Sequence, residues 1–220
     1  MARAHFYRRL VELTAAGDDR DHIGVVLLAD PRIPSRLDHL AGRGPSPVPA
    51  LRCAAQQLEA AGATVVALPS STTHAYYDDI AACVGVPLLH LPTVILKAVA
   101  ARGWRTVGLM ATTPTVRLYH RWAGDYAVRL QCPDPGTQDD LMTLVNQVKL
   151  GAGLERAGSG LETLRMRPWS RDVDGVILGC TELPVVYPRK ARSRSLVDAT
   201  DELARAALRA RGRIQRAPER

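Results

Sequence analysis

The chain has few aromatic residues and no long apolar run, and each shortage excludes a class of protein. Phe, Trp and Tyr make up 5% of its 220 residues, too few to supply the stacking surfaces that bind single-stranded nucleic acids. No apolar run approaches the roughly 20 residues that span a bilayer, and the N-terminal residues lack the apolar core of a signal peptide. We therefore expect no membrane partner and a cytoplasmic location.

Cysteine patterns typical of metal sites and disulfide frameworks are also absent. The chain has four cysteines, at positions 53, 83, 132 and 180, and no two of them form a C-x-x-C pair. Its six histidines are scattered, so the ligand spacing of a zinc site is missing too. In a reducing compartment we expect free thiols and no bound metal.

The net charge of +7 suggests nucleic-acid binding until the charge is located. From residue 188 to the end there are ten Lys or Arg against four Asp or Glu, which accounts for nearly all of the excess. A solvated helix face and tail explains this surplus better than a nucleic-acid site, because no aromatic side chains accompany it. We expect no nucleic-acid partner.

Short β-branched runs alternate with helical patterns along the chain, which predicts an α/β fold with parallel sheets. Strands are expected at residues 24–29, 64–68, 86–89, 106–110, 128–131, 176–178 and 195–197. Helices are expected at 6–14, 50–61, 75–83, 90–103, 138–150, 154–165 and from about 201.

The rest of the chain is organised around residues 173–183, V-D-G-V-I-L-G-C-T-E-L. The run that ends at Leu178 is typical of a strand buried on both faces. Gly179 then lets the backbone turn, so that Cys180 follows at the carboxyl end of the strand, where ligands bind in open α/β sheets. On this stretch alone, an acid/base or nucleophilic thiol and a small buried cysteine that caps a strand are equally good interpretations.

Three of the expected strands end in hydroxyl-rich turns that lead into helices. They read S-S-T-T-H at 70–74, A-T-T-P-T at 111–115 and G-C-T-E-L at 179–183. The free backbone N–H groups at a helix start attract anions. One such turn is ordinary capping, but three of them, together with the loop that carries Arg36, predict a pocket that binds carboxylates.

Five motifs in the right order resemble those of the aspartate/glutamate racemase family, the cofactor-independent amino-acid racemases. Residues 69–74 resemble its Pro-Cys-Asn-Thr-Ala-His, and residues 179–182 reproduce its Gly-Cys-Thr-Glu. Residues 31–36 resemble its Pro-Gln-Ile-Pro-x-Arg loop. Residues 111–115, A-T-T-P-T, are similar to its Ala-Thr-x-Gly-Thr turn, and residues 148–151, V-K-L-G, fit its Val-Lys-x-Gly sequence.

The resemblance implies two similar Rossmann-like lobes with parallel sheets, related by a pseudo-twofold axis, with the active site between them. Lobe one would comprise residues 1–90 and about 195–220, and lobe two about 91–194. The resemblance also implies proton transfer without pyridoxal phosphate or another cofactor, on a small acidic substrate such as aspartate or glutamate. It is compatible with a homodimer.

In this family each lobe contributes one cysteine, and the two cysteines act on opposite faces of the substrate's α-carbon. Cys180 matches the second cysteine, and Ser70 replaces the first. A serine hydroxyl is far too weak an acid to match a thiolate as a resting base, so we expect Cys180 to be the principal acid/base, with Ser70 on the opposite face. The match assigns substrate binding to Arg36, Ser71, Thr72, Thr112, Thr115, Lys149 and Thr181, and a proton relay to His74 or Glu182.

Simpler interpretations remain open for several of these residues. Arg36 can be a solvated loop arginine, and Lys149 a lysine on a helix surface. His74 can cap the start of a helix, and Glu182 can support the turn that follows Cys180, because a carboxylate is favourable at a helix start.

One segment of the family pattern has no counterpart in this sequence. The family begins with a strand and a Gly-Gly-Met-Gly-Pro loop, ahead of the helix that here starts near Ala4. In the fold that strand lies between those expected at 24–29 and 64–68, so we expect a central gap between them.

Three functions follow from these observations. The leading one is a racemase-like isomerase that acts on an acidic amino acid. The second is a one-cysteine decarboxylase of the arylmalonate decarboxylase type, in which Cys180 protonates the enediolate. The third is a binding homologue whose catalysis is impaired.

Overall fold

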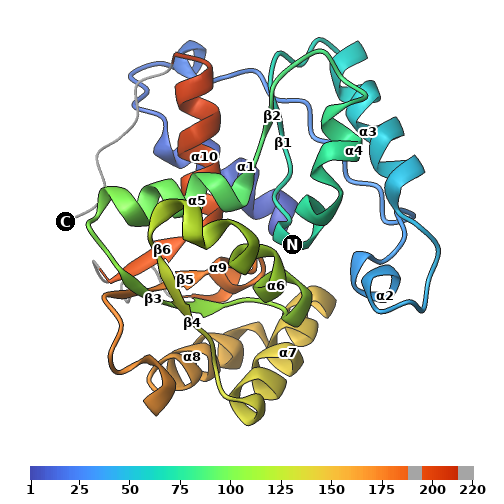
Figure 1. Cartoon of the computed structure of the whole chain (residues 1–220). Helices are drawn as coiled ribbons and strands as arrows, with labels where there is room; N and C mark the ends of the chain where they lie inside the picture. The colour runs from blue at the N-terminus through green and yellow to red at the C-terminus, as the bar shows by residue number, and fades with distance from the viewer. Residues whose placement is uncertain (188–194, 213–220) are drawn as a thin grey trace.

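The computed structural model of the chain describes residues 1–187 and 195–212. Two parallel sheets are covered by helices, so the predicted α/β class is confirmed (Figure 1). Much of the basic surplus near the C-terminus falls outside the described residues. None of the helices in the described part of the chain is long and apolar enough to cross a membrane.

The larger sheet has four parallel strands in the order β4-β3-β5-β6. Its centre is formed by β3 (Thr106–Met110) and β5 (Gly175–Leu178), and its edges by β4 (Arg129–Gln131) and β6 (Leu196–Asp198). Every residue of β5 is buried, as expected for an apolar run that is covered on both faces.

The smaller sheet is a single parallel pair, β1 (Val66–Ala67) and β2 (Leu88–Leu89). The remaining elements, in chain order, are α1 (Ala2–Leu13), η1 (Asp19–Asp21), α2 (Arg36–Leu40), α3 (Val48–Ala60), η2 (Ser71–Tyr76), α4 (Tyr77–Ala81), α5 (Leu91–Ala101), α6 (Thr113–Ala123), η3 (Gly124–Tyr126), α7 (Pro135–Leu150), α8 (Leu154–Arg165), η4 (Pro168–Ser170), α9 (Leu183–Val186) and α10 (Ala199–Ala210). The predicted elements agree with these bounds within a few residues, apart from one strand, whereas α2, α6 and α9 have no counterpart among the predicted helices.

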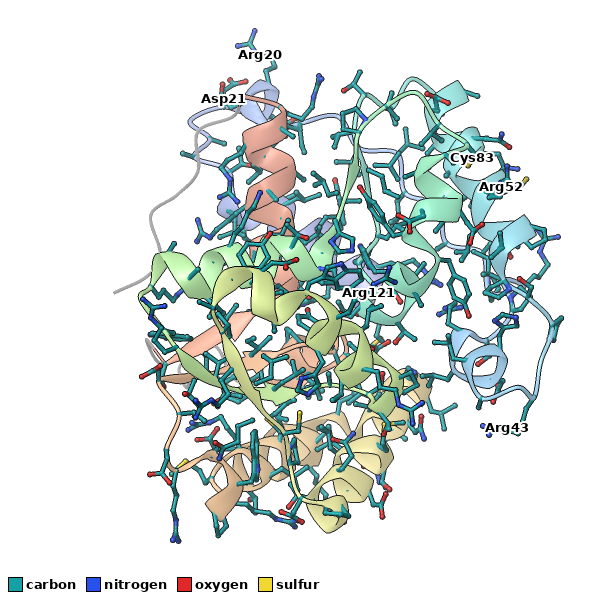
Figure 2. The ribbon with its side chains drawn as sticks, viewed as in Figure 1. Arg20, Asp21, Arg43, Arg52, Cys83 and Arg121 are labelled. Atoms are coloured by element: carbon teal, nitrogen blue, oxygen red, sulfur yellow. The ribbon has the colours of Figure 1, made fainter. Side chains whose placement is uncertain are left out.

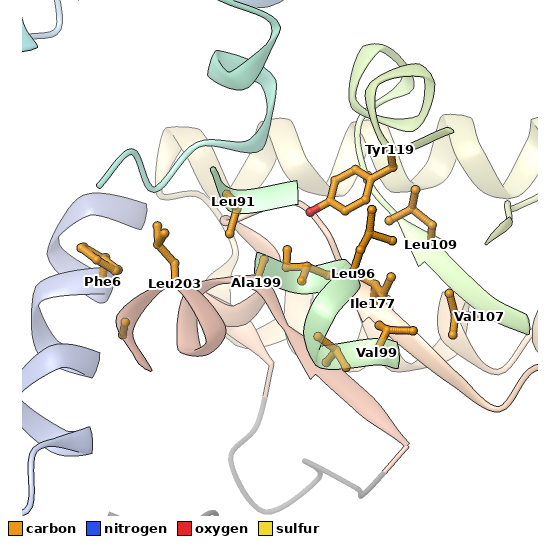
Figure 3. Packing of buried hydrophobic residues seen from close by; sticks show 14 of the residues in the cluster. Phe6, Leu91, Leu96, Val99, Val107, Leu109, Tyr119, Ile177, Ala199 and Leu203 are labelled. Atoms are coloured by element: carbon orange, nitrogen blue, oxygen red, sulfur yellow. The ribbon is translucent and has the colours of Figure 1, made fainter. Parts of the chain in front are cut away.

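The two faces of the larger sheet are buried in separate hydrophobic clusters. On one face, Ile177 of β5 belongs to the cluster that joins α1, α5 and α10, part of which Figure 3 shows. On the other face, Val176 and Leu178 belong to the cluster with α7 and α8. This alternation along one strand is what the two-residue period of a β-strand requires, and it holds the carboxyl end of β5 in place.

The predicted strand at 24–29 is wrong. The segment forms no strand and pairs with none in the described part of the chain. Val25, Val26 and Leu27 are 39%, 53% and 49% exposed. A cavity of about 1050 Å³ is lined by this segment and by residues 63–68 around β1. An apolar run becomes a buried strand only if a neighbouring strand satisfies its backbone groups, and here this cavity lies beside the run.

The division into lobes remains a prediction, but one strand lies on the other side of the proposed boundary. β6, which the division assigns to lobe one, pairs with β5 in the larger sheet. The chain then returns through α10, which packs on α1. The pairing with β5 satisfies the backbone groups of residues 196–198, so β6 belongs to the larger sheet. The chain leaves that sheet only after β6.

Candidate active site

A pocket of about 60 Å³ gathers nearly all the residues that the sequence singled out. Its lining includes the end of β5, the start of η2, the start of α6 and the loop before α2. The predicted residues that line it are Arg36, Ser70, Ser71, Thr72, Thr112, Thr115, Lys149, Cys180, Thr181 and Glu182. Ser35 and Leu37 also line it. The sequence predicted only Arg36 as a site residue in this loop, because nothing in the residue types of Ser35 and Leu37 distinguished them as binding residues.

Two hydroxyl groups bridge the two candidate turns in a reciprocal pattern. Ser71 Oγ donates to the carbonyl oxygen of Gly179 at 2.5 Å. Thr181 Oγ1 donates to the carbonyl oxygen of Pro69 at 3.0 Å. The residue after each candidate acid/base thus binds the residue before the other one, which is what a local pseudo-twofold axis produces.

This pattern puts Ser70 and Cys180 at equivalent positions of two turns, and both line the pocket. Gly179 lets the second turn pass close to β3, because a Cβ atom there would lie 2.8 Å from Leu109 Cδ1. Its N–H group also extends the sheet by donating to the carbonyl oxygen of Met110 at 2.9 Å. A larger residue at position 179 would displace the thiol that follows.

Cys180 is buried, with 5% of its surface exposed, and its thiol donates to Glu182 Oε2 at 3.0 Å. Burial raises the pKa of this thiol well above its ordinary value, and the negative charge of Glu182 raises it further. The positive charge of Lys149 acts in the opposite direction. The thiol is therefore protonated near pH 7, and its hydrogen bond to Glu182 favours that form.

Ser70 has a different set of partners. Its Oγ accepts a hydrogen bond from Thr73 Oγ1 at 2.9 Å, so its own proton remains available to the pocket. No carboxylate is bonded to this hydroxyl among the described residues. The group is suited to donate a proton and poorly suited to remove one.

His74 is buried below this turn and does not line the pocket. Its Nε2 accepts from the N–H group of Leu91 at 3.0 Å, so its Nδ1–H is left to donate to the carbonyl oxygen of Ser70, also at 3.0 Å. Burial lowers its pKa to about 4, which keeps the ring neutral near pH 7. In this geometry His74 anchors the backbone of Ser70 to α5, in agreement with the capping interpretation, and a relay role stays a prediction.

Three threonine hydroxyls form a cluster on another wall of the pocket. Thr115 Oγ1 lies 2.9 Å from Thr72 Oγ1 and 2.8 Å from Thr112 Oγ1, and the third pair is 3.3 Å apart. Hydroxyl protons can rotate between partners. The cluster sits at the start of α6, whose backbone N–H groups also favour an anion.

Positive charge enters the pocket from two further elements. Arg36 begins α2, and its guanidinium donates to the carbonyl oxygen of Pro34 at 3.2 Å. Burial lowers the pKa of this guanidinium, and the neighbouring charge of Arg3 lowers it further. Lys149 comes from the last turn of α7. A carboxylate in the pocket would meet both cations.

The other three cysteines lie outside this pocket. Cys53 is exposed on α3, and Cys83 lies beside the same helix, where its Sγ approaches the carbonyl oxygen of Arg52 at 3.7 Å (Figure 2). Cys132 is half-buried after β4. No cluster of His, Cys, Asp or Glu with the arrangement of a metal site occurs in the part of the chain that the structure describes.

Comparisons with known proteins point to one family. A family model described as Asp/Glu/Hydantoin racemase matches residues 1–207. The aspartate racemase of Picrophilus torridus superposes with a TM-score of 0.88 and 26% identity, covering 98% of this chain and 91% of that one. An Asp/Glu racemase from Yersinia pestis, described as putative, superposes with a TM-score of 0.77 and 23% identity over 95% of this chain and 93% of its own.

One relative found by sequence similarity is also named as a racemase. The broad specificity amino-acid racemase RacX of Bacillus subtilis (strain 168) is 24% identical over 156 residues, which is 70% of this chain and 67% of the relative. The match to aspartate racemases extends to the two-lobed fold that the motifs predicted.

Proposed function

The chain belongs to the Asp/Glu/hydantoin racemase family, and from this premise we propose that it is a racemase-like isomerase that moves the α-proton of aspartate, glutamate or a similar acidic amino acid without a cofactor. The observation that carries the proposal is the reciprocal pair of hydroxyl bridges. They join the turns that carry Ser70 and Cys180, and both of these residues line a pocket rich in hydroxyl groups and cations.

On the Cys180 side, the thiol must lose its proton before it can act as a base. Its raised pKa keeps the thiolate a minor form, which the positive charge of Lys149 stabilises while the thiol proton goes to solvent, and this thiolate then removes the α-proton of the bound substrate. The α-proton is very weakly acidic because the neighbouring carboxylate is already charged. The charge that develops on the enediolate is offset by the threonine cluster, the start of α6 and Lys149.

On the Ser70 side, the hydroxyl delivers a proton to the opposite face of the enediolate. Because a serine hydroxyl is a poor base, exchange of the α-proton on the Cys180 face is faster than inversion, while kcat/KM for inversion is equal in both directions since the two enantiomers have equal free energy. Arg36 is placed to bind the side-chain carboxylate of the substrate, which would make the site selective for acidic amino acids.

The raised pKa of Cys180 favours a second candidate, the decarboxylation of a substituted malonate. In that reaction the bond between the α-carbon and one carboxylate breaks, CO₂ leaves and its electron pair stays behind as the enediolate. The enediolate then takes the thiol proton from Cys180, and solvent restores it. A neutral thiol is the right starting state for this step.

The two functions are tested by NMR in ²H₂O and by CO₂ release. Wild-type protein is incubated with L- and D-aspartate, L- and D-glutamate and phenylmalonate, beside Cys180→Ala and the matched control Cys132→Ala. The proposal predicts α-deuteration of an acidic amino acid that is lost in Cys180→Ala and kept in Cys132→Ala. CO₂ release without deuteration identifies the decarboxylase, and deuteration that survives in Cys180→Ala contradicts both candidates.

A further inference from the structure

The short helix α2 brings Arg36 to the pocket, although the helix has little packing of its own. None of its five residues is buried, and it lies at the lower right margin of the molecule in Figure 1. Isolated helices shorter than about 12–15 residues are marginal in water. Contacts with another element must therefore hold α2, and with it Arg36, in place.

One hydrogen bond joins this helix to another element of the described structure. His39 Nδ1 lies 2.7 Å from the hydroxyl oxygen of Tyr76 on η2, and the two rings are tilted against each other with their centroids 5.6 Å apart. Within the described part of the chain, every other hydrogen bond of residues 35–43 stays inside residues 34–43. The pair of His39 and Tyr76 is therefore the polar contact that fixes α2 on η2.

Tyr76 is itself held firmly. Its ring is buried in the hydrophobic cluster around β1 and β2. Burial also raises the pKa of its hydroxyl, so the group stays protonated and uncharged near pH 7. Ile33, which precedes α2, packs on the same cluster. The chain around Arg36 is thus held by an apolar contact before the helix and by the hydrogen bond to Tyr76 within it.

Arg36 depends on this support for its direction. It lies three residues before His39, on the same side of α2. Its partly buried guanidinium donates to the carbonyl oxygen of Pro34 at 3.2 Å and forms no ion pair among the described residues. Such a cation favours an anionic ligand, and a carboxylate binds a guanidinium best through two parallel N–H···O bonds in one plane. A small rotation of α2 would weaken that interaction.

We propose that His39 and Tyr76 are positioning residues for Arg36, and that their hydrogen bond makes the pocket selective for substrates with a second carboxylate. Neither side chain lines the pocket, so both act on the substrate through Arg36. The inference rests on the carboxylate-binding role that the proposed function gives to Arg36, but not on proton transfer at Cys180.

The test compares Tyr76→Phe, which removes one oxygen atom and keeps the buried ring, with His39→Leu and the double variant. Tyr77→Phe is the matched control, because that neighbouring hydroxyl donates to the carbonyl oxygen of Leu88 at 2.9 Å and not to α2. Calorimetric titrations measure the Kd of succinate and of butyrate, which has the same carbon chain and one carboxylate fewer.

We expect succinate to bind about fivefold more weakly to Tyr76→Phe and to His39→Leu, the effect of one hydrogen bond. The double variant should lose no more than either single variant, because both changes remove the same bond. The Kd of butyrate should not change in any variant, and Tyr77→Phe should bind both probes as the wild-type protein does.

Hydrogen exchange of the amides in residues 37–43 reports on α2 independently of any ligand. These amides should exchange about fivefold faster in Tyr76→Phe than in Tyr77→Phe, because the helix opens more often without its bond to η2. In an active enzyme the KM of an acidic substrate should rise about fivefold in Tyr76→Phe with little change in kcat, since Arg36 binds the substrate away from the reacting carbon.

Three results would overturn the inference. They are an unchanged succinate affinity in Tyr76→Phe, an equal loss of affinity for succinate and butyrate, and a wild-type protein that binds succinate no more tightly than butyrate. Additive losses in the double variant, or unchanged exchange in α2, would overturn it as well. If the probes bind as expected while the wild-type protein deuterates no acidic amino acid, the inference stands and the proposed function fails.

Discussion

The turns that carry Ser70 and Cys180 are alike in backbone geometry and unlike in acid–base chemistry. Each follows a parallel strand, and each donates a hydroxyl hydrogen to the other. One holds a thiol bonded to a carboxylate, and the other holds a hydroxyl that accepts from Thr73. A symmetric frame therefore does not imply two equal proton carriers.

The sheets behind the two turns also differ, in how completely their strands are paired. β5 lies inside a four-stranded sheet and is paired on both edges. Among the described residues β1 is paired only with β2, and the residues around it border the large cavity. The turn that carries Cys180 thus stands on the more completely paired sheet.

The change that restores chemical symmetry should have the largest effect. Ser70→Cys supplies a thiol on the second face, and a well-placed general acid/base contributes roughly 10²–10⁴-fold. We expect racemisation of the acidic substrate to rise by about 100-fold in both directions, measured by circular dichroism from each enantiomer. Cys132→Ser serves as a control for handling of the free thiols. If the protein is instead a decarboxylase, the second thiol should lower the enantiomeric purity of its product, and no change in either reaction would count against both.

A change at Glu182 should increase the chemical difference between the two turns, whereas Ser70→Cys reduces it. The carboxylate of Glu182 raises the pKa of the thiol, so Glu182→Gln should lower that pKa by removing the negative charge. We expect the alkylation profile of Cys180 to move down by about one pH unit, with the rate at pH 8 about tenfold higher. Glu162→Gln, which lies outside the pocket, is the control. A profile that stays in place would show that burial alone sets the pKa.

Removal of the bridges should have the smallest effect. Ser71→Ala and Thr181→Val each leave a carbonyl oxygen without its partner, at a cost of about 1–3 kcal/mol in the free energy of unfolding. Urea titrations of both variants and of the double variant measure it. Thr163→Val removes an exposed hydroxyl that bonds within α8 and should cost less than either. Equal losses for all three single variants would mean that the bridges do not tie the turns together.

The sequence predicted the strand ends well because buried apolar runs followed by glycine, serine or threonine leave few alternatives. β3 has the predicted bounds, and the pocket collects the predicted hydroxyl residues. The strand at 24–29 failed because an apolar pattern carries no information about whether a pairing partner is present.

Other features depend on contacts between distant segments. The bridge from Ser71 to Gly179 joins residues 108 positions apart, and no local pattern predicts it. His74 looks like a proton carrier in the sequence, and only the fold shows both ring nitrogens bonded to backbone.

The central claim is that Cys180 and Ser70 act as unequal partners on one α-carbon. The stereochemical course of α-deuteration in ²H₂O tests this claim most directly. Wild-type protein is given each enantiomer of the active substrate separately, and deuteration and inversion are followed together by ¹H NMR and chiral chromatography. The account predicts rapid deuteration of one enantiomer with retention, because Cys180 returns a deuteron more often than Ser70 delivers one, and slow deuteration of the other. Equal deuteration of both enantiomers, each coupled one-to-one to inversion, would contradict it.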